Sequence, residues 1–153
     1  MLFLIWEKGA FIITKQQYKN LTERIIAYLE EDRKNNLPAG DWLYLVCVEP
    51  SKMPYLKIIE NTLESMQDLV SGYIETFVLE RTLTNATISL VFNENGNFED
   101  LPNNRLLVCE GLKINLKGNI LIIKTNANGV TCNLSEEEAE RYINLFRTRE
   151  INL

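Results

Sequence analysis

The sequence of 153 residues contains no histidine and only three cysteines. Without histidine the chain lacks the usual general base at neutral pH and the commonest metal ligand, so Ser–His and Cys–His catalytic arrangements are excluded. Cys47, Cys109 and Cys132 are widely spaced and lie in or beside apolar runs. This pattern favours reduced core thiols over a disulfide framework or a zinc site.

Long apolar runs and excess basic charge are also lacking. No run approaches the roughly 18 apolar residues that a membrane span needs, and the start, MLFLIWEKG, has neither the basic region nor the apolar length of a secretion signal. We therefore expect a cytoplasmic protein with no membrane association, in which the glycosylation sequons at Asn20, Asn85 and Asn133 are chance matches. The net charge of −5 disfavours general nucleic-acid binding, which needs a basic surface.

The residues that are present predict a single α+β domain over residues 1–153, with a hydrophobic fraction of 46% and a charged fraction of 24%. Helical spacing and capping residues predict three helices, and alternating or continuous apolar runs bounded by turn residues predict strands. We expect a mixed or antiparallel sheet with the helices packed on it. The helices are expected at about 15–33, 62–71 and 135–148, and the strands at 2–6, 10–13, 42–48, 55–60, 73–80, 87–92, 106–109, 114–116, 119–124 and 130–132.

Local signals mark several ends of these elements. Thr14 is a predicted N-cap, and Ser135 with Glu138 forms a predicted capping box. Gly72 is expected to end the second helix, and Asn128-Gly129 predicts a tight hairpin turn. The aromatic residues within predicted strands, Trp42, Tyr55 and Tyr73, are expected in the core more than in a pocket.

A segment rich in asparagine, Val91–Leu107, separates two apolar runs and reads as a structured loop. Amide side chains can read the edges of a base, and a guanidinium can hold phosphate or carboxylate with two parallel bonds. The segment therefore supplies the candidate residues for binding a ligand or a partner. They are Asn93, Asn95, Asn103, Asn104 and Arg105.

Structural interpretations of the same segment remain open. Arg105 follows a proline turn, where an arginine often ties a loop to backbone carbonyls or to a carboxylate such as Glu49 or Glu75. The spacing of Asn93, Asn95 and Asn97 superficially resembles a calcium loop, but no bidentate glutamate closes a loop of the right length. We therefore predict no metal site, no cofactor and no catalytic residue.

Several short motifs occur in a characteristic order. They are Val48-Glu49-Pro50, Thr62-Leu63-Glu64-Ser65-Met66-Gln67, Gly72-Tyr73-Ile74-Glu75, Asn93-Glu94-Asn95-Gly96 and Leu101-Pro102-Asn103-Asn104-Arg105. Together they resemble the bacterial and phage domain family DUF3846 over about residues 46–146, although Ser71 stands where the family has the first glycine of a pair. The resemblance implies an α+β domain common in phages and conjugative elements, and leaves residues 1–41 as an N-terminal strand–turn–strand–helix addition.

Two functions follow as hypotheses. The first is a non-enzymatic accessory protein of a phage or mobile genetic element that binds a host protein, with anti-CRISPR or anti-restriction inhibition as its sharpest form. The alternative is a domain that binds a small polar ligand or a nucleotide through the asparagine-rich loop and Arg105. An enzyme is disfavoured because the sequence shows no activated nucleophile or base.

Overall fold

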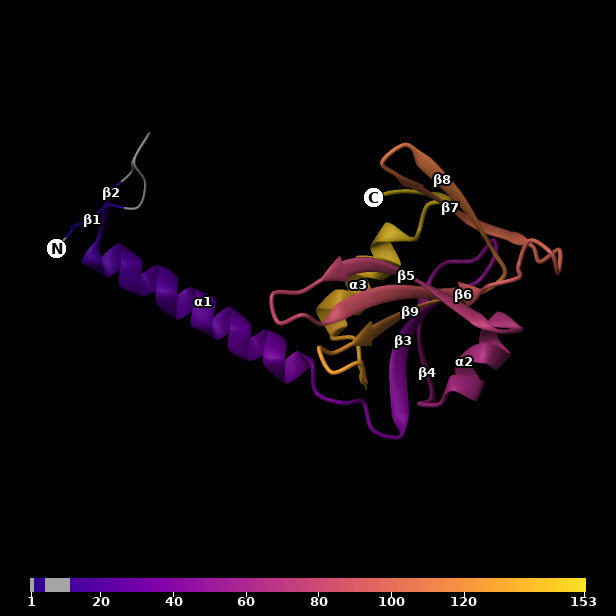
Figure 1. The fold of residues 1–153 in the computed structure, drawn as a ribbon, viewed down its shortest axis with the longest axis horizontal. Coiled ribbons are helices and arrows are strands. Elements are labelled where there is room, and N and C mark those ends of the chain that lie inside the picture. The colour runs from indigo at the N-terminus through magenta and orange to yellow at the C-terminus, as the bar shows by residue number, and fades with distance from the viewer. Residues whose placement is uncertain (1, 5–11) are drawn as a thin grey trace. The chain divides into compact units, whose positions relative to one another are not determined.

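The computed structural model describes residues 2–4 and 12–153 (Figure 1). The chain divides into two compact units, Met1–Lys34 and Asn35–Leu153. Within the described residues, no helix combines the length and the apolarity that crossing a bilayer requires.

The smaller unit contains strands β1 (Leu2–Leu4) and β2 (Ile12–Thr14), which pair antiparallel, and most of helix α1 (Lys15–Asn35). The turn predicted between the two strands lies outside the described residues. The predicted N-cap is confirmed, because Thr14 Oγ1 accepts a hydrogen bond from the Gln17 backbone N–H at 3.1 Å. Gln17 Oε1 accepts from the Thr14 N–H at 2.9 Å, so each residue satisfies a free donor at the start of the helix.

The larger unit is built on a six-stranded antiparallel sheet, in which five strands follow the order β4-β3-β9-β6-β5 and the sixth, β10, pairs with β9. The central strand β9 is buried along almost its whole length, as its continuous apolar sequence predicts for a strand covered on both faces. The strands are β3 (Trp42–Val48), β4 (Tyr55–Glu60), β5 (Ile74–Arg81), β6 (Thr87–Asn93), β9 (Ile120–Thr125) and β10 (Thr131–Cys132).

Each face of this sheet carries its own hydrophobic core. Helix α2 (Leu63–Val70) covers one face, where Met66 and Val70 pack with Leu45 and Leu121. The other face is covered by helix α3 (Glu136–Leu145) together with a second sheet. The predicted capping box opens α3, since Ser135 and Glu138 each accept a hydrogen bond from the other's backbone N–H.

The second sheet has three strands in the order β11-β7-β8 and is mixed. Strand β7 (Asn103–Cys109) pairs antiparallel with β8 (Leu112–Lys117) and parallel with β11 (Glu150–Asn152). Leu107 and Ile151 from this sheet enter the core beside α3. The expected α+β fold with mixed and antiparallel pairing is therefore confirmed.

The asparagine-rich segment is shorter as a loop than predicted. Strand β7 begins at Asn103 instead of Leu106, so Asn103, Asn104 and Arg105 belong to a strand. The pairing of Asn103 with Lys117 is followed by that of Arg105 with Leu116, which leaves Asn104 as the extra residue of a β-bulge. Polar residues have weak strand propensity, and here the partner strand β8 supplies the pairing that the local sequence does not predict.

Two further expectations are wrong. Trp42, Tyr55 and Tyr73 are exposed at 57%, 36% and 69%, so they are not core residues. The left-handed residue that ends α2 is Ser71, with φ +64°, instead of Gly72. Gly72 is needed for space, because a Cβ atom there would lie 2.7 Å from Asn93 Nδ2.

Candidate functional site

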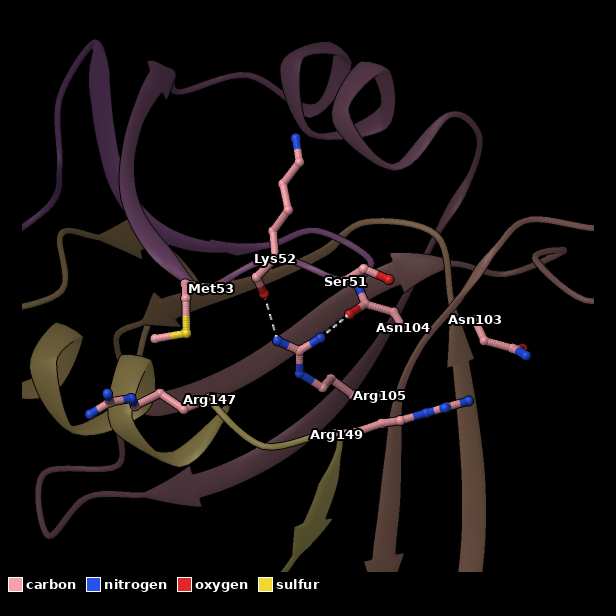
Figure 2. A pocket seen from close by; sticks show the side chains of 8 residues that line it. All are labelled: Ser51, Lys52, Met53, Asn103, Asn104, Arg105, Arg147 and Arg149. Atoms are coloured by element: carbon pink, nitrogen blue, oxygen red, sulfur yellow. Dashed lines mark hydrogen bonds between the residues drawn. The ribbon is translucent and has the colours of Figure 1, made fainter.

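A cavity of about 450 Å³ opens where three segments of the larger unit meet (Figure 2). The connection between β3 and β4, the start of β7 and the segment that joins α3 to β11 supply its walls. Its lining is rich in cations and amides and includes no acidic residue, in a chain whose net charge is −5. The lining residues of this Arg105 pocket are Ser51, Lys52, Met53, Asn103, Asn104, Arg105, Arg147 and Arg149.

Arg105 holds the three segments together and is only 5% exposed. Its Nε donates to the carbonyl of Phe146 at 2.9 Å, and its terminal nitrogens donate to the carbonyl of Lys52 and to Asn104 Oδ1, each at 2.8 Å. Figure 2 shows the last two bonds converging on the guanidinium. Burial lowers the pKa of Arg105 below its ordinary value, and a guanidinium remains charged at neutral pH.

Asn104 orients this arginine and is itself fixed. Its Nδ2 donates at 2.7 Å to the carbonyls of Val48 and Gly118, so its Oδ1 is left to accept from Arg105. The bulge makes this contact possible, because regular alternation would send neighbouring side chains to opposite faces of the strand. Gly118 has φ +73°, and a Cβ atom at that position would lie 2.8 Å from a Leu101 methyl carbon.

The other cations of the pocket are held differently. Lys52 pairs with Glu49 at 3.5 Å, and Figure 2 shows its ammonium pointing away from Arg105. Arg147 and Arg149 flank Arg105 and extend in opposite directions in that view. Their segment is anchored by the carbonyl of Arg149, which accepts from the Leu106 N–H at 2.9 Å.

The charge of the three arginines in the pocket is not balanced by a carboxylate in the part of the chain that the structure describes. Among the described residues, Arg105, Arg147 and Arg149 form no ion pair with a carboxylate. A buried charge is costly unless it is paired. The arrangement can therefore attract and hold an anion.

The five candidate residues from the sequence do not form one site. Asn103, Asn104 and Arg105 line the Arg105 pocket, whereas Asn93 and Asn95 do not. Asn93 is buried and structural, because its Nδ2 donates to the carbonyls of Val70 and Ser71 and to Glu99, at distances of 3.0–3.1 Å. Its Oδ1 accepts from the Asn95 N–H at 2.7 Å. These contacts clamp the end of α2 to the turn after β6.

The pocket includes cations that sequence reasoning did not find. Arg147 and Arg149 alternate directly after α3, and Lys52 lies in a short turn. Basic residues at the end of a helix are ordinary, so their pattern carries no specific signal. Within the described residues, no three side chains of the histidine, cysteine, aspartate and glutamate types gather as a metal site.

Comparison with known families gives a match over residues 43–147 to the model described as Domain of unknown function (DUF3846). The match confirms the resemblance seen in the order of the motifs. It contains the described lining residues from Ser51 to Arg147 and ends just before Arg149. No curated protein and no solved structure matches the chain.

Proposed function

The chain belongs to the DUF3846 family, and we propose that it is a non-enzymatic binding domain that captures an anionic group in the Arg105 pocket. The observation that carries the proposal is the buried guanidinium of Arg105, which lines the pocket and has no carboxylate partner among the described residues. A carboxylate or phosphate would supply the missing charge and could accept the fork of N–H donors.

The other residues of the pocket support binding instead of catalysis. Arg147 and Arg149 add positive charge, and the amide of Asn103 adds hydrogen-bonding capacity. Guanidinium and amide groups hold an anion well but do not abstract protons at neutral pH. The sequence also suggests the binding of a small polar ligand as one of its two functions. The site proposed here lies at the start of β7 and not in the asparagine-rich loop.

The test is thermal unfolding of the full chain in the presence of sodium phosphate, sodium citrate or sodium chloride at equal ionic strength. At low millimolar anion, where the general stabilisation of proteins by phosphate and citrate is small, we expect either anion to raise Tm above its value in chloride, because a ligand at 100 times its Kd adds about 2.7 kcal/mol to the free energy of unfolding. Equal Tm values with all three salts would count against an anion site.

A second candidate function rests on a different surface. Trp42, Tyr44, Leu56 and Ile58 share one face of the β3–β4 pair and are exposed at 57%, 41%, 48% and 54%. Strand β4 is at the edge of its sheet. Contiguous exposed apolar surface marks sites of protein interaction, which favours the binding of a host protein by an accessory protein of a phage or mobile element.

This second function can be tested in host cells that restrict or silence an incoming plasmid. If the protein inhibits anti-plasmid defence by CRISPR or restriction, its expression should raise plasmid survival, and the double variant Tyr44→Ser, Ile58→Ser should remove that gain. Leu112→Ser is the matched control, because Leu112 is 68% exposed and lies on β8. Plasmid survival that is unchanged by the wild-type protein would contradict the anti-defence function.

A further inference from the structure

The donors of Arg105 are only partly used. A guanidinium has five N–H groups, and contacts within the chain engage Nε once and each terminal nitrogen once. One N–H on each terminal nitrogen is therefore left without a described partner. Both nitrogens belong to a side chain that is 5% exposed and lines the pocket, so an oxyanion in the cavity is the natural acceptor.

The balance of charge around the pocket favours a ligand with at least two negative charges. Arg105, Arg147 and Arg149 bring to the lining three cations that have no carboxylate partner in residues 2–4 and 12–153, whereas the charge of Lys52 is offset by Glu49 at 3.5 Å. A single carboxylate brings one negative charge and leaves most of this charge uncompensated. A phosphate monoester brings about 1.5 to 2 negative charges at neutral pH, together with three acceptor oxygens.

The size of the pocket indicates that the ligand is more than inorganic phosphate. Its volume of about 450 Å³ lies within the range of roughly 300–1,000 Å³ found for sites of small molecules and cofactors. Met53, which is 54% exposed, offers a polarizable apolar wall for an organic group. Asn103 Oδ1 accepts from Asn115 at 3.0 Å, so the amide N–H groups of Asn103 remain to donate to a base or a sugar.

We infer that the Arg105 pocket binds a phosphorylated small molecule of nucleotide size, with its phosphate on Arg105 and its remaining charge shared by Arg147 and Arg149. The inference rests on the proposed anion-binding function and narrows the class of ligand. The phosphate would occupy the buried centre of the pocket, and the organic part would extend over Met53 or toward Asn103.

The inference is tested by calorimetric titration of the full chain with four probes, namely adenosine, acetate, inorganic phosphate and adenosine monophosphate. We expect the tightest binding for the monophosphate, weaker binding for inorganic phosphate, and none for adenosine. The double variant Arg147→Gln, Arg149→Gln keeps the buried Arg105 and should weaken monophosphate binding by roughly tenfold or more, as expected for the loss of charged hydrogen bonds.

The matched control is the double variant Arg81→Gln, Lys113→Gln, which removes the same charge from exposed positions on β5 and β8. It should bind the monophosphate as the wild type does. Acetate binding as tightly as the phosphates would overturn the inference and leave the anion site standing. Equal loss in the two double variants would also overturn it, because the phosphate would then lie outside the pocket. No binding of any anion would overturn both proposals.

Discussion

At the scale of single residues, Arg105 makes the contacts of a structural residue and keeps the unbalanced charge that the proposed binding function needs. It ties the pocket together through the carbonyls of Lys52 and Phe146, as the structural interpretation expected, and it reaches no described carboxylate. The same contacts that fix its position also leave its charge unbalanced. A residue can therefore be structural in its hydrogen bonds and still be available to a ligand through its charge.

The variant Arg105→Met should lower the free energy of unfolding by about 1–3 kcal/mol, because it leaves buried acceptors on Phe146, Lys52 and Asn104 without a donor. Loss of the desolvated charge offsets part of this cost. Urea denaturation measures the change. Arg149→Met is the control, since Arg149 is exposed and its substitution should stay within about 0.5 kcal/mol. Equal midpoints for both variants would contradict the structural role of Arg105.

Asn93 and Gly72 make a second residue-scale pair. Gly72→Ala should be destabilising by about 1–3 kcal/mol, because the new methyl group would lie 2.7 Å from an Asn93 nitrogen that is held by Val70 and Ser71. In the background of Asn93→Ala the same substitution should cost much less. A double-mutant cycle measured by urea denaturation checks this coupling. If the two substitutions lower the free energy of unfolding of the double variant by the sum of their separate effects, the two side chains do not compete for space.

At the scale of elements, the sequence predicted best where one strand carries its own signal. Trp42–Val48 and Tyr55–Glu60 were predicted with the bounds observed for β3 and β4, because apolar runs end there at turn residues. Strand β11 was missed, since its three residues pair in parallel with β7 and have no pattern of their own. The early start of β7 was missed because its first residues are polar and form a strand only through their pairing with β8.

The pocket could be predicted only in part. Arg105 and its asparagine neighbours stand out in the sequence as polar residues beside a proline turn. Arg147 and Arg149 reach the same cavity only because α3 packs on the sheet and β11 returns beside β7. Such convergence depends on tertiary packing over a separation of about 40 positions, so local spacing cannot reveal it.

At the scale of the whole molecule, the larger unit contains both hydrophobic cores and the family match. Its first residues contribute to that core region. The carbonyl of Asn35 accepts from the fully buried Lys124 ammonium at 3.2 Å, which also pairs with Glu138 at 2.9 Å. Pro38 and Ala39 pair with Cys132 and Thr131.

A truncated chain of residues 35–153 should therefore fold, and under the proposed function it should bind anions with the affinity of the full chain. Circular dichroism and urea denaturation measure the first property, and calorimetric titration with phosphate measures the second. A shorter chain of residues 41–153 serves as the comparison, because it lacks the carbonyl that holds Lys124 and the pairing at Pro38. It should unfold at lower urea. Failure of the 35–153 chain to fold would contradict the independence of this unit.

Alkaline solution should destabilise the folded chain. Burial raises the pKa of the Cys47 and Cys132 thiols above 9.0, and burial with a hydrogen bond to Glu80 raises the pKa of Tyr142 above 10.0. At a pH above these ordinary values the unfolded chain binds fewer protons than the native one, so stability falls as pH rises. The stabilisation of the folded chain by these protonated groups is fully present below about pH 9.

Urea midpoints at about pH 8 and about pH 10.5 measure this loss of stability at alkaline pH. Its sign follows from the raised pKa values of the two thiols and Tyr142. The double variant Cys47→Ala, Cys132→Ala should show a smaller fall between the two conditions, whatever its stability at the lower pH. Tyr142→Phe should likewise flatten the most alkaline part of the profile. An identical fall in wild type and variants would assign the effect to other groups.

The bulge at Asn104 offers a way to separate family members that have the Arg105 pocket from those that lack it. Deleting one residue between Pro102 and Arg105 would remove the bulge while Arg105 stays paired with Leu116, so the neighbouring amide would turn to the other face of β7 and no longer accept from the guanidinium. The number of residues between that proline and that arginine therefore indicates, in another sequence, whether the bulge is present. Homologues that keep the spacing should have the Arg105 pocket, and those with an insertion or deletion there should have lost its geometry while retaining the sheet.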